Sequence, residues 1–304
     1  MNSTNRRIIM HLTLGVFGDN ELLKNLGKQG TVNDIMIYNH ASSEGVFTFV
    51  APNSERVQPL LQAISMTDVP VISGELTKEV AEQIVALDAF GFGKGFLVGE
   101  HFQKFVKGTS LENFGIVSDE KELREKIKSL EAPELTKNVW APVDNYFNVK
   151  SVGTVVLTVL KGGAIKKYDK LLVQPIGKEA VVKGIQSQDN DIDEAQHGMR
   201  LGLNLKGVEA DDLKRGYVIC KEANVSKTLK IEFKKSRFAK EGIETGSSVL
   251  VSVGLQVIAA KAEANGAEIT LTLEHPAAYF PGQKCIIAST KQTLPRIIGS
   301  GKIS

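Results

Sequence analysis

Apolar residues from position 8 to about position 130 alternate between short strand-like runs and longer runs with helical spacing. The strand-like runs span 8–17, 34–38, 46–50, 69–72 and 95–98, and the helix-like runs span 21–26, 54–65, 77–90 and 119–130. Thr77 and Ser118 stand where N-terminal caps of the last two helices are expected. Strands that alternate with helices predict a mostly parallel sheet with helices on both faces.

Helical spacing disappears after Pro133, where short apolar runs recur between turns rich in Gly, Asp and Asn. These runs span 152–160, 171–173, 180–186, 199–205, 217–220, 227–233, 247–253, 255–262, 268–273 and 283–289, and a last strand is expected by residue 303. Such a pattern is typical of all-β barrels or sandwiches. We therefore predict an α/β domain at 1–133 and two β-barrels at 134–222 and 223–304.

The composition is that of an ordinary globular chain. Of 304 residues, 42% are apolar and 24% are charged, and no window reaches the roughly 18 to 20 apolar residues that a membrane span requires. The two cysteines and five histidines form no ligand spacing, which argues against structural zinc and against a disulfide framework. We expect a cytoplasmic protein without a membrane partner.

The net charge of +2 is unevenly distributed along the chain: −4 over 1–133, +1 over 134–222 and +5 over 223–304. The densest basic segment is 227–240, KTLKIEFKKSRFAK, which has six cations and the single acid Glu232. A phosphate backbone would be attracted to this stripe. The alternative interpretation is an ordinary solvated strand face.

Residues 147–219 contain an ordered series of short motifs. They are GTVV at 153–156, LKGGAI at 160–165, YDKLL at 168–172, VKGIQ at 182–186, AQHG at 195–198, LGLNLKG at 201–207 and DDLKRG at 211–216. The series resembles the second domain of the translational GTPases, the family of elongation factor Tu, elongation factor 1-alpha and the selenocysteine-specific factor SelB. The resemblance implies a P-loop-NTPase-like α/β domain followed by two elongation-factor β-barrels, in the order that the apolar pattern predicts.

The motifs with which that family binds GTP and Mg²⁺ are missing. A GxxxxGK[ST] loop should follow the first strand, but here GVFGDN at 15–20 leads directly into a helix, and Gly27-Lys28 is followed by Gln29. The DxPGH and NKxD motifs correspond to VAPN at 50–53 and GEHF at 99–102. Thr31 could match the switch threonine. We predict a degenerate, nucleotide-free GTPase-like domain with no catalytic residue, metal or cofactor.

Candidate RNA contacts on the second domain follow from the same resemblance. In the family, this domain holds the aminoacyl end of transfer RNA, and by position the resemblance implies Gln186, Gln188 and Arg200 as contacts here. The family commonly has glutamate in place of Gln186 and asparagine in place of Arg200. Both side chains can still hydrogen-bond ribose or phosphate. Otherwise, the three would be exposed barrel-loop residues.

Candidate contacts on the third domain come from the basic segment. The family's third domain contacts the acceptor and T stems of transfer RNA, and the basic segment lies where that domain begins. Lys234, Lys235 and Arg237 at its centre are therefore candidate phosphate contacts.

Three functions remain open. The first is a binding module without GTPase chemistry, whose partner is transfer RNA, the ribosome or another translation protein. The second is an atypical elongation factor of the SelB or elongation factor Tu type, which uses GTP and Mg²⁺ to deliver aminoacyl-tRNA. The third is a regulatory partner that pairs with an active paralogue through its acidic first domain. SelB-type factors continue beyond the third domain and this sequence does not, so we do not expect the usual selenocysteine role.

Overall fold

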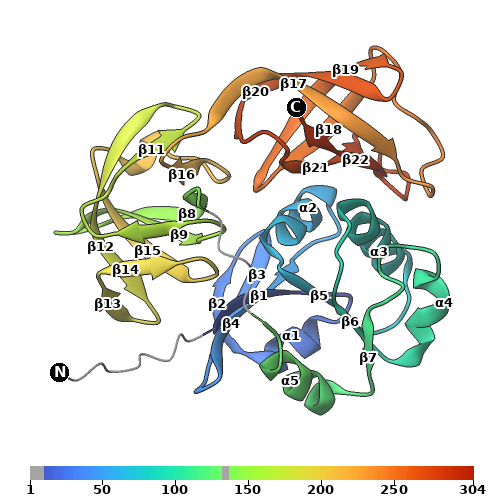
Figure 1. Cartoon of the computed structure of the whole chain (residues 1–304), viewed down its shortest axis with the longest axis horizontal. Coiled ribbons are helices and arrows are strands. Elements are labelled where there is room, and N and C mark those ends of the chain that lie inside the picture. The colour runs from blue at the N-terminus through green and yellow to red at the C-terminus, as the bar shows by residue number, and fades with distance from the viewer. Residues whose placement is uncertain (1–9, 132–136) are drawn as a thin grey trace.

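The computed structural model describes residues 10–131 and 137–304, which form an α/β domain and two all-β bodies (Figure 1). The predicted fold class is thus confirmed. The predicted boundary between residues 133 and 134 lies outside the described residues, as do positions 8 and 9 of the first predicted strand.

The α/β domain contains one seven-stranded sheet in the order β2-β3-β4-β1-β5-β6-β7. Its strands are β1 (Met10–Phe17), β2 (Lys28–Val32), β3 (Ile35–Ala41), β4 (Gly45–Pro52), β5 (Val69–Ile72), β6 (Phe96–Val98) and β7 (Gly115–Val117). Its helices are α1 (Asn20–Leu26), α2 (Val57–Met66), α3 (Lys78–Phe90), α4 (Gln103–Val106) and α5 (Glu120–Lys128), with a 3₁₀ turn at Glu100–Phe102. β4, β1, β5, β6 and β7 pair in parallel, as predicted, whereas β2 and β3 form an antiparallel edge.

Helices cover both faces of the sheet. Successive side chains of β1 point to opposite faces, so this strand packs against helices on both sides. Leu12 and Leu14 pack in a buried cluster with residues of α1 and α5. Phe17 faces the other way and packs with residues of α2 and α3. The central strands are buried on both sides and read as apolar runs, which is why the sequence predicted them well.

Of the two predicted N-terminal caps, Thr77 is confirmed and Ser118 is wrong. Thr77 caps α3, since its hydroxyl accepts a 3.3 Å hydrogen bond from the backbone nitrogen of Val80. The predicted cap Ser118 is wrong by one residue. Asp119 caps α5 by accepting from the backbone nitrogen of Glu122 at 2.9 Å, and Ser118 instead donates to the side chain of Glu122. This reciprocal pairing resembles a capping box.

The first barrel is a ring of six antiparallel strands, closed because β11 pairs with both β16 and β12. Its strands, in ring order, are β11 (Lys170–Gln174), β16 (Val218–Cys220), β8 (Trp140–Val149), β9 (Gly153–Val159), β15 (Arg200–Lys206) and β12 (Lys178–Ser187). β13 (Asn190–Ile192) pairs antiparallel with the end of β12, and β10 (Ala164–Lys166) pairs with β14 (Glu194–Gln196). The apolar pattern missed β8, in which Pro142 and the buried Asp144 interrupt the alternation.

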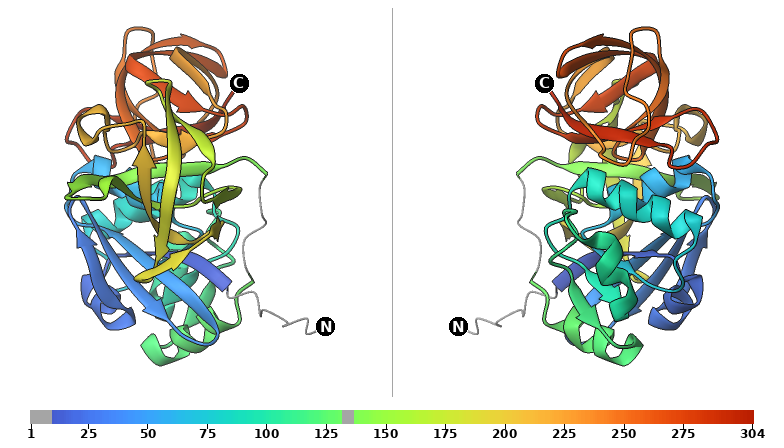
Figure 2. Two further views of the ribbon diagram at one scale, coloured as in Figure 1. Left: turned by 90° about the vertical axis from the view of Figure 1, so that its left-hand side faces the viewer. Right: turned by 90° about the vertical axis from the view of Figure 1, so that its right-hand side faces the viewer.

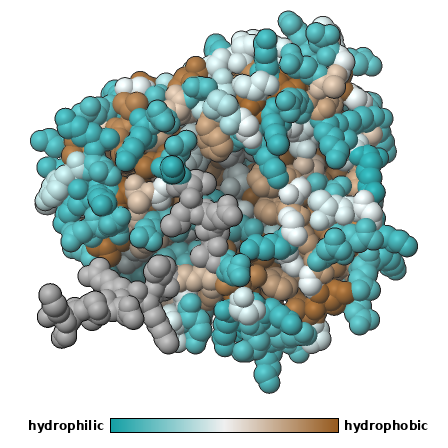
Figure 3. All heavy atoms as spheres, viewed as in Figure 1, coloured by the Kyte–Doolittle hydropathy of each residue, from teal (hydrophilic) through white to brown (hydrophobic). Residues whose placement is uncertain are grey.

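The second barrel is also closed, in the order β17-β20-β19-β18-β21-β22. Its strands are β17 (Asn224–Lys235), β18 (Ser248–Val253), β19 (Gln256–Asn265), β20 (Glu268–Tyr279), β21 (Lys284–Ser289) and β22 (Ile297–Ile303). The two views of Figure 2 show this barrel above the α/β domain. Hydrophilic residues cover most of the face of the molecule in Figure 3, as expected for side chains outside the cores.

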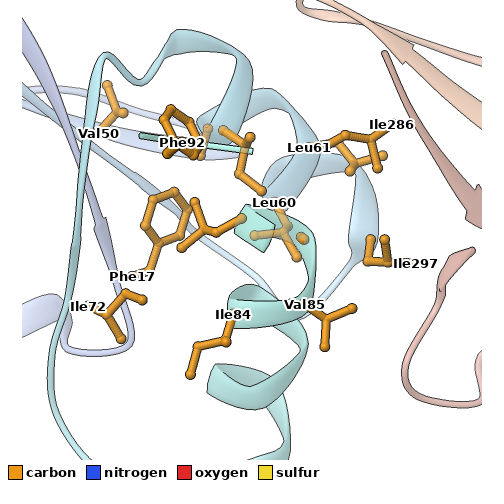
Figure 4. Packing of buried hydrophobic residues seen from close by; sticks show 14 of the residues in the cluster. Phe17, Val50, Leu60, Leu61, Ile72, Ile84, Val85, Phe92, Ile286 and Ile297 are labelled. Atoms are coloured by element: carbon orange, nitrogen blue, oxygen red, sulfur yellow. The ribbon is translucent and has the colours of Figure 1, made fainter. Parts of the chain in front are cut away.

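The α/β domain and the second barrel share one core. Leu61 of α2 and Val85 of α3 belong to the same buried cluster as Phe17 of the sheet and as Ile286 and Ile297 of the second barrel (Figure 4). Helices α2 and α3 therefore lie between the sheet and the barrel, and they bury apolar surface on both sides.

A buried ion pair also joins these two bodies. The Arg296 guanidinium binds the Glu82 carboxylate through two of its nitrogens. Nε lies 3.0 Å from Oε1 and 3.1 Å from Oε2, and Nη2 donates to Oε2. The backbone nitrogen of Arg296 donates to Oε1 at 2.6 Å, and Nη2 donates to the carbonyl oxygen of Glu55 at 2.6 Å. Each charge is thus satisfied by several partners, as buried charges require.

A second polar contact joins the α/β domain to the first barrel. Lys161, which follows β9, forms an ion pair with Asp68 and donates a hydrogen bond to the carbonyl oxygen of Met66 at 2.9 Å. His197 lies beside this pair. Burial lowers the pKa of the His197 imidazole, and the nearby Lys161 charge lowers it further, while Asp68 opposes the shift. Burial also lowers the pKa of His11 on β1.

Lowering the pH from about 7 to about 5 is expected to destabilise the protein through these two histidines. The unfolded chain takes up their protons near pH 6.5, whereas the folded chain resists protonation, so stability is lost as the pH falls below 6.5. The measurement is the thermal unfolding midpoint across this range. His197→Gln should flatten the decline, and the exposed His275→Gln is the control. An unchanged decline in the His197 variant would contradict this assignment.

Candidate functional site

The turn between β1 and α1 contains only Gly18 and Asp19, so the strand passes into the helix without a loop. Gly18 has a φ of +103°, and a Cβ at this position would lie 2.1 Å from the carbonyl oxygen of Ser73. Asp19 caps α1, since its Oδ1 accepts a 2.8 Å hydrogen bond from the backbone nitrogen of Glu21. Two residues are too few to wrap a phosphate with consecutive backbone amides, which is how a phosphate loop works.

A hollow of about 560 Å³ lies where the carboxyl ends of β1, β4 and β5 meet. Ligands of open α/β sheets bind at such a position. Its lining includes four carboxylate side chains, those of Asp19, Glu55, Glu75 and Glu79. Among the described residues, no lysine or arginine lines it. A hydrogen bond from the Thr77 hydroxyl lowers the pKa of Glu79, which favours its charged form. The hollow would therefore repel a polyphosphate.

Two further positions relevant to nucleotide binding make contacts with the protein itself. The hydroxyl of Thr31 on β2 accepts a 2.7 Å hydrogen bond from Nη2 of Arg200 in the first barrel. His101, in the segment that replaces NKxD, has its Nε2 3.0 Å from the carbonyl oxygen of Gly74, a residue that lines the acidic hollow.

A larger cleft of about 750 Å³ opens between the α/β domain and the first barrel. The three predicted RNA contacts of the first barrel, Gln186, Gln188 and Arg200, all line it. The α/β domain contributes the end of α1, the start of β2, part of β3 and one residue of α5. Its lining residues are Asn25, Leu26, Gly27, Lys28, Gln29, Gly30, Asn39, His40, Ala41 and Arg124. The first barrel adds Leu157, Asp189, Leu201 and Gly202. Amides and cations therefore predominate around the cleft, unlike in the acidic hollow.

The three residues are positioned by different local structures. Gln186 lies on β12, where its amide nitrogen donates to Oδ1 of Asp191 at 3.0 Å. Gln188 and Asp189 have φ of 51° and 61° and form the two-residue turn that joins β12 to β13. Arg200 begins β15, and burial lowers its pKa, although an arginine remains charged at neutral pH. Arg200 is therefore a half-buried strand residue, not an exposed loop residue.

The basic candidates lie elsewhere. Lys234 and Lys235 end β17, Arg237 follows two residues later, and all three are exposed. None of them lines the cleft. Nη2 of Arg237 donates to the carbonyl oxygen of Lys107 at 3.1 Å, beside α4. The structure thus divides the six predicted contacts into two separate groups of three.

The sequence analysis did not identify the cleft-lining residues that the α/β domain contributes. Lys28 and Asn39 lie on the edge hairpin β2–β3, and Arg124 lies on α5, where Nη2 bonds the carbonyl oxygen of Asn25. Most of β2 is exposed, with no apolar alternation that could have predicted it. Its pairing with β3 brings these residues to the first barrel.

Comparisons with known proteins agree with this architecture. The family model of elongation factor Tu domain 2 matches residues 153–220. An uncharacterized protein of Methanocaldococcus jannaschii is 36% identical over 96% of this chain and 99% of its own length. The selenocysteine-specific elongation factor of the same organism is 34% identical over 39% of this chain, a match that covers only 26% of that factor.

The solved structures extend the agreement to the whole fold. Translation elongation factor SelB from Methanococcus maripaludis, in complex with the GTP analogue GPPNHP, superposes with a TM-score of 0.82 over 97% of this chain and 79% of its own, at 20% identity. The chain therefore belongs to the translational GTPase superfamily. Its first barrel is elongation-factor-like, and its three bodies are arranged as in SelB. Over the described ranges, no helix is both long and apolar enough to cross a membrane.

Proposed function

We propose that this protein is a translation-factor-like RNA-binding protein that does not use guanine nucleotide. The observation that carries the proposal is the direct turn from β1 through Gly18 and Asp19 into α1. Since the turn offers no cradle of amides, no lysine and no hydroxyl for Mg²⁺, the fold retains the position of a nucleotide site without its chemistry. The proposal places the protein in the cytoplasm, because relatives that it matches are elongation factors.

The nucleotide part of the proposal predicts no binding. Titration of GTP or GDP with Mg²⁺ into the protein should give no calorimetric signal at micromolar concentrations, because the four carboxylates of the hollow oppose a polyphosphate. The thermal unfolding midpoint of the same sample is the control for folded protein. Micromolar or tighter affinity for GTP would overturn this part of the proposal and favour the GTP- and Mg²⁺-dependent reading, which the structural similarity to GPPNHP-bound SelB supports.

The RNA part of the proposal rests on the cleft. Its volume of about 750 Å³ suits one or two nucleotides, and amide and guanidinium groups can bond ribose, phosphate and base edges. The free 3′ end of a transfer RNA is single-stranded and can enter such a cleft. We therefore assign Gln186, Gln188 and Arg200 to the RNA end and treat the ribosome or another translation protein as further partners of the complex.

Filter binding of transfer RNA tests the cleft. Gln188→Glu adds a carboxylate next to Asp189 in the cleft, and we expect at least tenfold weaker binding because phosphate is then repelled. Gln196→Glu on β14 is a matched control, since this exposed glutamine is on the same barrel but does not line the cleft. Equal binding by both variants would contradict the cleft assignment, and no salt-dependent binding by the parent protein would overturn the RNA function.

A further inference from the structure

A band of exposed cations and aromatic rings crosses the boundary between the α/β domain and the second barrel. On the α/β side, Lys104, Phe105 and Lys107 belong to α4 and its C-terminal end, and all three are exposed. Lys104 lies over the Phe105 ring, with Nζ 4.9 Å from its centroid. The right-hand view of Figure 2 faces this side of the molecule, with α3 and α4 below the barrel.

The barrel side of the band meets α4 directly. Arg237 bonds the carbonyl oxygen of Lys107, and a Cβ on Gly108 would lie 3.1 Å from Nη1 of Arg237. The guanidinium also lies over the exposed Phe238 ring at 4.7 Å. Lys107 and Arg237 are 130 residues apart in the chain, so no local pattern could indicate that the two basic segments form one surface.

The band continues along β17 to a small hollow of about 230 Å³ at the end of α3. Lys234, Lys284 and Lys302 line it together with Phe90 and Ser300, and Glu232 is its single acid. Lys234 is three residues from Arg237, so the Cα atoms of these two residues are at most about 11 Å apart. Lys284 donates to the carbonyl oxygens of Phe90 and Gly91, which fixes its ammonium at the hollow.

No described carboxylate forms an ion pair with these cations. Across residues 10–131 and 137–304, Lys104, Lys107 and Arg237 form no ion pair. The same is true of the three lysines of the hollow. Lys284 and Lys302 line the same hollow, so their charges repel each other. Burial lowers the pKa of Lys284, and the Lys302 charge lowers it further. An incoming anion would relieve this repulsion.

We propose that this band is a second RNA-binding surface, composed jointly of α4 and the second barrel. Separated cations suit a phosphate backbone, and exposed phenylalanine rings offer stacking faces for unpaired bases, a combination that an RNA strand satisfies. The inference rests on the proposed RNA function but adds α4 of the α/β domain to the contact. RNA bound here bridges the two bodies, because the band includes side chains from both.

The test compares the parent protein with the double variant Lys104→Gln/Lys107→Gln. The quantity measured is the salt dependence of transfer RNA binding. If each lysine neutralises one phosphate, the slope of log affinity against log salt should fall by about 1.4 to 1.8, and affinity near 0.1 M salt should fall about tenfold or more. Lys150→Gln/Lys221→Gln is the matched control, because both lysines are exposed on the first barrel and form no described ion pair. Thermal midpoints confirm that both variants are folded.

The outcomes separate this inference from the proposed function. A lower slope and affinity in the α4 variant alone supports the band. An unchanged slope, with binding that is still weakened by Gln188→Glu, overturns the band and leaves the cleft assignment standing. A reduced slope together with no effect of Gln188→Glu supports the band and overturns the cleft. If the parent protein binds no transfer RNA at any salt concentration, both proposals fail.

Discussion

Glu82→Ala is expected to destabilise the protein by about 3–5 kcal/mol. The substitution leaves the guanidinium of Arg296 buried between α3 and the second barrel without its carboxylate, and a buried uncompensated charge is among the most costly defects in a fold. The backbone nitrogen of Arg296 also loses its acceptor. The measurement is the urea unfolding midpoint and the derived free energy of unfolding.

Two further variants identify the source of the loss. Glu82→Leu combined with Arg296→Met removes both charges and should recover much of the stability, because an apolar pair can replace a buried ion pair. Glu241→Ala removes the exposed ion pair with Lys291 and should have little or no effect. A Glu82→Ala protein whose midpoint equals that of the Glu241 variant would show that the buried pair is not important for stability.

Gly18→Ala is expected to cost about 3 kcal/mol or more. The added methyl group would lie 2.1 Å from the carbonyl oxygen of Ser73, which is backbone and cannot move aside, and the φ of +103° disfavours any side chain. The change should lower the thermal midpoint and should loosen the entry into α1.

Gly93→Ala provides the matched control for this prediction. No atom lies within 4 Å of a Cβ built at Gly93, and its φ is not in the left-handed region, so alanine should be neutral or slightly stabilising there. If the two alanine variants unfold at the same temperature, the turn between β1 and α1 is more adaptable than its geometry indicates.

The sequence predicted the parts of the fold in which one strong local signal acts. The buried central strands of the α/β sheet stand out as apolar runs, and Thr77 marks the start of α3 correctly. The missed strand β8 contains the buried Asp144, whose Oδ1 lies 2.9 Å from Nη2 of Arg215. That partner is 71 residues away, so no local pattern predicts it.

The same distinction applies to the candidate site. The family resemblance selected Gln186, Gln188 and Arg200, and the structure brings them to one cleft. It could not supply Lys28, because the exposed strand β2 has no periodic pattern. Nor could it show that Arg237 contacts α4, since that contact depends on how the second barrel is seated on the α/β domain. Their roles in RNA binding stay predictions.

The core shared by the α/β domain and the second barrel has a mechanical consequence. Thr77 and Glu79, at the start of α3, line the acidic hollow, while Val85 farther along the same helix is packed in a cluster with Ile286 and Ile297 of the barrel. Densely packed side chains transmit displacement instead of absorbing it. A displacement of α3 at the hollow would therefore be passed on to the second barrel through these packed side chains.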